Sequence, residues 1–193
     1  MTQKKWFMPV AIIGALVIIG MMFISWANGV YDKAVSLQEN TEAQWGNVQG
    51  AYQRRADLVP QLVATVKGAA ENEHKILTEV TQARAGIVNA KTPEDMELMG
   101  QKINTAINLA FEAYPEIKST QNFRDLQAQL EGTENRIAVE RRRYNEAAKE
   151  YNKYIRGIFR KKALAFFGEE DEFLKKEMFK ASSGAENAPK VEF

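Results

Sequence analysis

Hydrophobic residues follow two patterns along this chain, a continuous run near the start and a regular spacing in most of the remainder. Between residues 6 and 27 there is no charged side chain, and most positions carry Ile, Val, Leu, Met or Phe. As an α-helix this run spans about 33 Å, close to the roughly 30 Å hydrocarbon core of a bilayer. It predicts a transmembrane helix over 6–27, whose lipid-contacting residues include Trp6, Phe7, Ile13, Leu16, Ile19, Phe23 and Trp26.

A cleaved secretory signal is the alternative interpretation of this segment. Lys4 and Lys5 would form its basic start, and Ser25-Trp26-Ala27 loosely matches a cleavage site. The apolar run is longer than the roughly 7–15 residues typical of a signal peptide, which favours a retained helix. Positive charge precedes the run, whereas Asp32 and Lys33 cancel after it, so we expect the N-terminus in the cytoplasm and the following domain exported.

From residue 28 onwards, apolar or small residues recur at alternating spacings of three and four, as in helices that bury one face. The repeats fall into four stretches, 30–52, 59–87, 96–110 and 123–158. We therefore predict an all-α fold in which the N-terminal transmembrane helix is followed by an antiparallel, elongated four-helix bundle. The expected divisions are a short N-terminal segment (1–5), the transmembrane helix (6–27), the bundle (28–160), a short amphipathic C-terminal helix (161–180) and a flexible tail (181–193).

Helix boundaries are predicted by capping residues and prolines. Thr92 and Pro93 mark a helix start, because threonine can cap a helix and proline suits its first position. Tyr114 and Pro115 mark the end of the same helix, since the residue before a proline disfavours the α region. The last long stretch of the bundle then begins after Pro115.

The segment 54–60 allows two interpretations. Either one long helix continues through Pro60 with a kink, or the chain reverses tightly with Asp57 as the N-cap of the next helix. A continuous helix from residue 29 to residue 90 would be about 90 Å long, and no other predicted element is long enough to cover it. This length argument favours the reversal.

The segment 159–167 mixes basic and apolar residues. Such a composition is typical of a helix lying at a membrane interface. A bundle end that packs Phe166 and Phe167 into the core is the other interpretation, and the sequence does not decide between them. Beyond Ala181 small and polar residues dominate, which predicts the flexible tail.

Composition excludes several classes of function. The chain of 193 residues has 26 basic and 25 acidic side chains, a formal net charge of +1, so no charge excess points to a nucleic acid partner. It contains no cysteine, which excludes thiol redox chemistry and zinc–thiolate sites. We therefore expect no nucleic acid binding and no cofactor.

The sequence does not predict a catalytic or metal site. Its single histidine, His74, lies near Glu71 and Glu73, but no HExxH spacing and no repeated Glu-x-x-His element occur. A solvated helix face explains these three residues more simply than a metal site. We expect no enzyme activity, no catalytic residue and no bound metal.

Three charged residues, Arg55, Glu73 and Glu140, fall on the apolar stripes where a hydrophobic residue is due. A buried arginine–glutamate pair would fix the register of the helices, because a buried charge must be paired. Edge positions that let the side chains reach solvent are the more ordinary explanation, and we favour it.

Several blocks of the sequence resemble the LemA family. The first comprises Gln44-Trp45, the run Gln-Arg-Arg-Ala-Asp-Leu-Val-Pro-Gln-Leu-Val over 53–63, and Val66-Lys67-Gly68. Further blocks follow in the family's order up to the terminal Val191-Glu192-Phe193. The residues that carry the resemblance include Trp45, Arg54, Arg55, Asp57, Pro60, Tyr114, Pro115, Glu134, Asn135, Tyr144, Asn145, Tyr151 and Asn152.

The resemblance implies a bacterial protein with an N-terminal membrane helix and an antiparallel helical bundle. It implies no enzymatic activity and supplies no catalytic residues. Together with the charge pattern, it implies a single-pass protein of the inner (cytoplasmic) membrane whose helical domain lies in the periplasm or outside the cell.

Two functions fit these expectations. We favour a non-catalytic scaffold of the cell envelope that contacts the lipid bilayer, forms homo-oligomers and contributes to membrane shape. The alternative is a binding or sensing module that regulates a membrane or envelope partner, which the sequence does not identify. Its candidate contacts are the turn at Pro115, the reversal over 54–60 and the tail 191–193.

Overall fold

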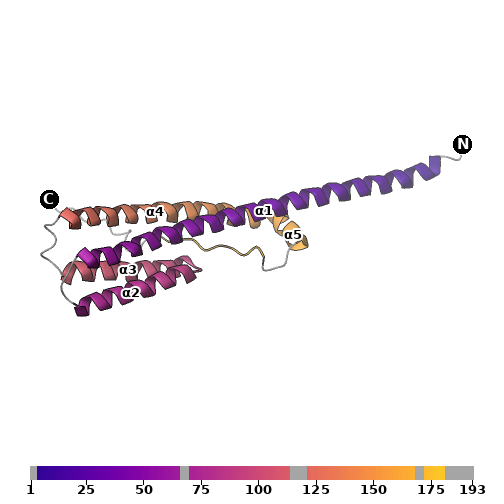
Figure 1. Ribbon diagram of the computed structural model, residues 1–193. Helices are drawn as coiled ribbons and strands as arrows, with labels where there is room; N and C mark the ends of the chain where they lie inside the picture. The colour runs from indigo at the N-terminus through magenta and orange to yellow at the C-terminus, as the bar shows by residue number, and fades with distance from the viewer. Residues whose placement is uncertain (1–3, 66–69, 114–120, 168–171, 181–193) are drawn as a thin grey trace, which may run out of the picture. The chain divides into compact units, whose positions relative to one another are not determined.

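The computed structural model describes residues 4–65, 70–113, 121–167 and 172–180. Every regular element in these ranges is a helix, which confirms the predicted all-α class (Figure 1). The predicted tail and the turn at Tyr114 and Pro115 lie outside these ranges, as do the side chains of Trp6 and Phe7. The helices are α1 (Lys4–Thr65), α2 (Ala70–Asn89), α3 (Pro93–Ala113), α4 (Gln121–Ile155) and α5 (Ile158–Phe167).

The chain divides into two compact units. The N-terminal unit contains residues 1–41 and 149–176, and the bundle unit contains residues 42–148 and 177–193. α1 and α4 contribute to both units, whereas α2 and α3 belong to the bundle unit and α5 to the N-terminal unit. The helical region expected as one bundle over 28–160 is therefore shared between two units.

Cross-helix contacts define the direction of α1 and α2 in the bundle unit. The Gln49 amide donates to the main-chain oxygens of Ile87 and Ala90 at 3.1 and 3.4 Å. Further along α1, Asp57 pairs with Arg84 at 2.9 Å. Because residue numbers rise along α1 as they fall along α2, the two helices are antiparallel, as predicted.

Apolar residues at the predicted spacing form the core of the bundle unit. Each of its four helices contributes at least four residues that are at most 8% exposed. They are Val48, Tyr52, Val59 and Leu62 of α1, Ile76, Val80, Ala83 and Ile87 of α2, Met96, Ile103, Ala106 and Ala110 of α3, and Leu126, Leu130, Ile137 and Tyr144 of α4. The predicted stripes are therefore confirmed at these positions.

A separate core holds the N-terminal unit together. It joins three helices through small and aromatic residues, namely Ala27, Val30 and Ala34 of α1, Tyr151 and Ile155 of α4, and Ala163 and Leu164 of α5. The small alanines let the helices approach closely, and the Tyr154 hydroxyl adds a hydrogen bond to the Val30 main-chain oxygen at 3.3 Å. Three segments far apart in sequence thus meet just after the apolar run.

The predicted reversal at Asp57 is wrong. α1 continues through Pro60 to Thr65, because the buried stripe persists on both sides of the proline at Leu58, Val59, Leu62 and Val63. The length argument failed because α4 packs with α1 in both cores, together with α5 in the N-terminal unit and with α2 and α3 in the bundle unit. α2 runs back along α1, so the chain does change direction, but only after Thr65.

The C-terminal helix also differs from its predicted bounds. α4 ends at Ile155, and α5 covers only 158–167 instead of 161–180. The break falls at Arg156 and Gly157, and it places Ile158 outside the α4 stripe, where it is 76% exposed. Residues 172–180, here called the strap, contain no helix.

The start of α3 has the predicted caps. The Thr92 hydroxyl accepts a hydrogen bond from the Asp95 main-chain N–H at 3.1 Å, and the Asp95 carboxylate accepts one from the Thr92 N–H at 3.3 Å. These reciprocal bonds satisfy two N–H groups at the helix start. The hydrogen bond from Thr92 lowers the pKa of Asp95.

Gly100→Ala is expected to destabilise the bundle unit. A Cβ on Gly100 would lie 2.6 Å from Cε1 of the buried Tyr52, so the ring or α3 would have to shift. We expect the free energy of unfolding to fall by about 1–3 kcal/mol, the usual cost of overpacking a core. Chemical denaturation of the full chain in detergent, followed by circular dichroism, measures this change.

Gly46→Ala is the matched control for Gly100→Ala. No neighbouring atom lies within 4 Å of its Cβ, and alanine in a helix is more favourable than glycine by roughly 0.5–1 kcal/mol. It should therefore leave stability unchanged or raise it. Equal effects of the two substitutions would show that the Tyr52 contact is unimportant.

Candidate functional site

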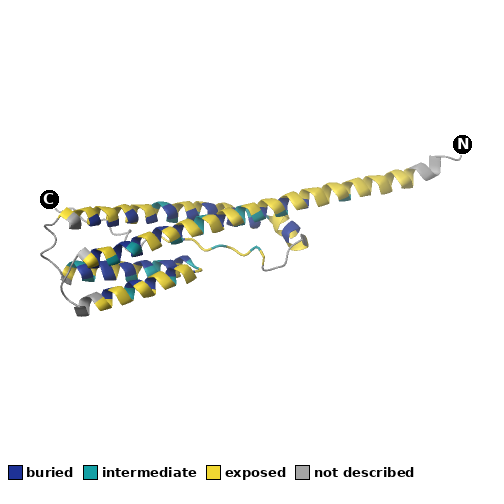
Figure 2. Ribbon diagram, in the orientation of Figure 1, coloured by how far each residue is buried: buried dark blue, intermediate teal, exposed yellow. Residues whose placement is uncertain are grey.

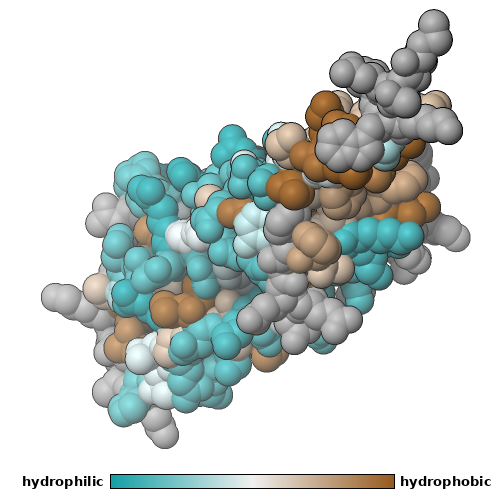
Figure 3. Space-filling model, turned by 90° about the vertical axis from the view of Figure 1, so that its right-hand side faces the viewer, coloured by the Kyte–Doolittle hydropathy of each residue, from teal (hydrophilic) through white to brown (hydrophobic). Residues whose placement is uncertain are grey.

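The apolar run at the start of α1 is the largest exposed feature among the described residues. Its large hydrophobic side chains from Met8 to Trp26 are between 45% and 71% exposed (Figure 2). Brown hydrophobic side chains gather at this end of the molecule in Figure 3. Within the described ranges, α1 is the one helix long and apolar enough to cross a membrane. Such a surface is unfavourable in water and is compatible with a membrane anchor.

Burial begins immediately after this run. Trp26 is 45% exposed, whereas Ala27 is completely buried in the core of the N-terminal unit. The helix itself shows no break at this point. The apolar surface therefore ends where α1 begins to pack against other helices of the same chain.

Arg55 makes the main buried polar network of the bundle unit. Arg55 is 8% exposed. Its guanidinium donates to the Leu130 main-chain oxygen at 2.8 Å and to the Asn104 side-chain oxygen at 3.1 Å. Longer contacts of 3.5 Å reach Thr133 and Glu134. One side chain of α1 is thereby bonded to both α3 and α4.

The Arg55 contacts correct the expectation that this residue reaches solvent from an edge position. The Glu134 side chain is 70% exposed, so its ion pair with Arg55 is screened and contributes little. The main partners are neutral oxygens of α3 and α4, which satisfy the buried guanidinium by hydrogen bonds.

Glu140 also departs from the edge expectation. Its side chain is only 6% exposed, and its carboxylate accepts two hydrogen bonds from Arg143, one turn later on α4, at 3.1 and 3.2 Å. Its partner is therefore a neighbour on the same helix, and the suggested pair with Arg55 does not form. The side chain of Glu73 lies outside the described residues.

Asn145 binds the strap in the bundle unit. Its side-chain amide donates to the main-chain oxygen of Phe179 at 2.9 Å, and its side-chain oxygen accepts from the main-chain N–H of Phe179 at 2.9 Å. The Asn145 side chain thereby bonds both the main-chain N–H and the main-chain oxygen of Phe179, as a neighbouring β-strand would. The Arg141 guanidinium also donates to the Lys180 main-chain oxygen at 3.2 Å.

The Phe179 ring fills an aromatic site beside this amide. The residue is 6% exposed, and its ring centroid lies 5.9 Å from that of Trp45 and 5.6 Å from that of Tyr144. Arg141 lies over the same ring at 4.6 Å and forms an ion pair with Glu97 of α3. Aromatic packing and a cation–π contact therefore fix this part of the strap.

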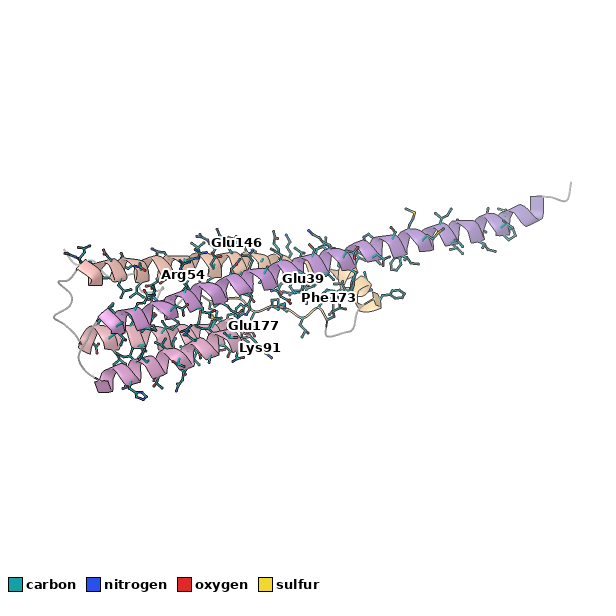
Figure 4. All side chains as sticks on the ribbon, in the orientation of Figure 1. Glu39, Arg54, Lys91, Glu146, Phe173 and Glu177 are labelled. Atoms are coloured by element: carbon teal, nitrogen blue, oxygen red, sulfur yellow. The ribbon has the colours of Figure 1, made fainter. Side chains whose placement is uncertain are left out.

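The N-terminal unit contains the same kind of amide contact. Asn152 donates to the main-chain oxygen of Lys176 at 2.8 Å and accepts from its N–H at 2.9 Å. The nearby Phe173, labelled in Figure 4, packs edge-on against Tyr31.

Two tyrosine hydroxyls in contact with the strap have raised pKa values. The Tyr144 hydroxyl donates to the Glu177 main-chain oxygen at 2.9 Å, and burial, with a smaller effect of the Glu177 carboxylate, raises its pKa to about 12. The Tyr31 hydroxyl donates to the Glu172 carboxylate at 2.5 Å, and this hydrogen bond raises the pKa of Tyr31. Both groups are therefore neutral donors at physiological pH.

His74 lies on an exposed part of α2. Its Nδ1 is 3.1 Å from the Thr78 hydroxyl on the next turn. The side chains of Glu71 and Glu73 lie outside the described residues. Among the residues that are described, no cluster of three or more histidine, cysteine, aspartate or glutamate side chains is suited to a metal ion.

The remaining predicted residues have different roles. Tyr151 is buried in the core of the N-terminal unit, whereas Arg54 and Asn135 are exposed. The structure adds Asn104 and Phe179, which the sequence did not suggest. Phe179 is an isolated aromatic residue in a segment expected to be helical, and Asn104 lies beside a stripe, so no local pattern marks either residue.

Two comparisons relate the chain to known proteins. A family model described as the LemA family matches residues 44–193, a range that begins after the apolar run. Among curated proteins, the chain is similar to "Protein LemA" of Metamycoplasma hominis, with 25% identity over 112 residues, which covers 56% of this chain and 51% of that protein. The chain thus spans about half the length of this relative.

Arg55→Ala is expected to lower the free energy of unfolding by about 2–4 kcal/mol, because it removes buried hydrogen bonds between three helices. Arg54→Ala is the matched control, and as an exposed substitution it should change stability by less than about 0.5 kcal/mol. Denaturation of the full chain in detergent measures both. If the two variants unfold alike, the Arg55 network does not stabilise the bundle unit.

The raised pKa of Tyr144 predicts a loss of stability in alkaline solution. A tyrosine in the unfolded chain loses its proton near pH 10, whereas the folded Tyr144 keeps it to about pH 12. The contribution of the protonated Tyr144 hydroxyl to the free energy of unfolding is therefore complete below pH 10 and is lost as the pH rises towards about 12. Urea denaturation across this range should show a shallower decline for Tyr144→Phe than for the unmodified chain. An identical decline would contradict this assignment.

Proposed function

Since the chain belongs to the LemA family, we propose that it is a membrane-anchored, non-catalytic helical protein of the bacterial cell envelope. It acts as a scaffold that self-associates and contributes to membrane shape. The observation that carries this proposal is the exposed apolar run of α1, which is continuous with the helix that enters both protein cores.

Retention of the anchor follows from the packing after it. Cleavage after Ala27 would remove a completely buried residue from the core of the N-terminal unit. Removing a buried side chain from a packed core destabilises it. The anchor is therefore kept in the mature protein, in preference to a cleaved signal.

The charge pattern supports one orientation. Lys4 and Lys5 precede the anchor, while Asp32 and Lys33 cancel after it. The positive-inside rule then places the N-terminus in the cytoplasm and both helical units on the far side of the inner membrane.

Exposed hydrophobic residues on the bundle unit support self-association. Leu77 and Val88 of α2 are 39% and 65% exposed, and Leu98 of α3 is 51% exposed. Leu77 and Val88 are eleven residues apart, about three turns, so they share one side of α2. The large rings of Tyr52, Tyr144 and Tyr151, by contrast, are packed inside the chain and give no support to an oligomer.

A binding or sensing module is the alternative function, and the strap favours it. Asn145 recognises main-chain groups of an extended segment, while the aromatic site beside it accepts a phenylalanine ring. Such a combination of main-chain hydrogen bonds and a side-chain pocket is typical of peptide recognition. In this chain the strap itself occupies the site.

Single cysteines test the scaffold proposal, since the chain has none of its own. Glu39→Cys should react with a membrane-impermeant thiol reagent in cells with a permeabilised outer barrier, because it follows the anchor. Val88→Cys should crosslink to a second copy in the membrane, and the exposed Lys149→Cys serves as the control. The mass in mild detergent should be a multiple of the chain mass.

The outcomes separate the alternatives. A protein that is monomeric in detergent, fails to crosslink to itself and leaves vesicles undeformed would rule out the scaffold. Crosslinks only to a different membrane protein would favour the regulatory module. Protection of Glu39→Cys from the reagent would reverse the proposed orientation.

A further inference from the structure

α5 is apolar on two opposite sides. One side carries Ala163 and Leu164, which are 2% and 6% exposed and belong to the core of the N-terminal unit. The other side carries Ile158, Phe159 and Phe166, which are 76%, 76% and 70% exposed. A short surface helix needs only one apolar side to pack, so the second side requires a separate explanation.

The exposed apolar residues share one face of α5. At about 100° per residue, Ile158, Lys162, Phe166 and Phe159 fall within an arc of about 100°. The buried pair, Ala163 and Leu164, is centred roughly 140° away. The interpretation that Phe166 packs into the bundle core is therefore wrong, while the side chain of Phe167 lies outside the described residues.

Basic residues accompany this face. Arg160, Lys161 and Lys162 are consecutive and exposed, and the sequence of α5 contains no acidic residue, whereas residues 169–172 that follow it are all acidic. The Arg160 guanidinium lies 4.4 Å above the Tyr154 ring, which holds it against the N-terminal unit. Lys162 lies within the apolar arc and Lys161 about 60° outside it. Long lysine stems can lie along apolar surface while their ammonium groups reach a charged layer.

The packing of α5 places it close to the apolar run within the same unit. Its buried residues contact the cluster that contains Ala27, Val30 and Ala34 of α1. Ala27 directly follows Trp26, the interfacial tryptophan, and Ala34 is about 12 Å further along the helix. α5 therefore packs on the part of α1 that directly follows the apolar run.

We infer that α5 is a lipid-binding site, which lies on the bilayer surface with Ile158, Phe159 and Phe166 between the lipid headgroups while Lys161 and Lys162 contact anionic headgroups. An apolar face that carries basic and no acidic residues within the helix matches an anionic bilayer surface. This inference rests on the membrane anchor proposed above. It adds a second contact that holds the N-terminal unit against the membrane.

Fluorescence quenching in proteoliposomes tests this site with the full chain. Ala165→Cys carries a polarity-sensitive dye on the exposed surface of α5 and leaves the apolar and basic residues intact. The vesicles contain phosphatidylcholine with or without phosphatidylglycerol, together with a quencher attached to a lipid chain. Phe23→Cys reports on the anchor, and Glu39→Cys, about 18 Å beyond Ala27 along α1, reports on the aqueous side.

We expect the dye at 165 to be quenched several-fold more than the dye at 39, and most strongly with phosphatidylglycerol. Ile158→Ser combined with Phe159→Ser should remove most of this quenching. Lys161→Gln combined with Lys162→Gln should reduce it only in the anionic vesicles, because each lysine near an anionic surface changes partitioning about fivefold. These side chains are exposed, so circular dichroism should show unchanged helix content.

Four results would overturn the inference. Quenching at 23 but not at 165 would leave the anchor in place and exclude the α5 site, whereas no quenching at 23 would exclude the anchor as well. Quenching at 165 that is unaffected by either double variant would show that this face does not cause it. The dye at 165 could also become more protected from an aqueous quencher as protein density rises, while the lipid-attached quencher has no effect. This result would mean that a second copy covers α5.

Discussion

α1 is helical from Lys4 to Thr65, so a single backbone serves an apolar surface at its start and two protein cores further along. A chain in hydrocarbon must satisfy its own main-chain hydrogen bonds, which an α-helix does. α1 does not end where the apolar surface gives way to the first core, so only the side chains mark this boundary. They are exposed and apolar on all sides up to Trp26 and buried on one side from Ala27. Because the helical period is uninterrupted, it fixes which α1 residues face each core.

Polar contacts determine how the surrounding segments fit against this helix. Apolar stripes bring helices together but tolerate sliding by a turn, since similar residues recur every three or four positions. The guanidinium of Arg55 finds the Leu130 oxygen and Asn104 in only one alignment of α1, α3 and α4. Neutral partners also let the arginine remain charged without a buried carboxylate, so the network stabilises one register at a modest electrostatic cost.

The sequence predicted what depends on local periodicity. Four helical stripes, the caps at Thr92 and Pro93, and the apolar run all follow from residue spacing and the chemistry of helix ends. The prediction failed at Pro60, because a proline looks like a boundary locally while buried residues on both sides keep the helix in place. It missed the strap for a different reason: Phe179 and Asn145 are 34 residues apart, and only the folded chain brings an amide on α4 beside main-chain groups of an extended segment.

The amide contacts of the strap have a consequence for how this segment can change in evolution. Asn145 binds the main-chain groups of Phe179, which every residue except proline provides in full, while the surrounding rings select the side chain at that one position. Strap residues bound through their main-chain oxygens, such as Glu177 and Lys180, are therefore freer to diverge in type than Glu172 and Phe173, whose side chains contact Tyr31. An insertion or deletion of one residue, however, would turn the ring away from Trp45 and place a different side chain there. The strap should accordingly drift in composition among relatives while the number of residues between Lys176 and Phe179, which the two asparagines bind, stays constant.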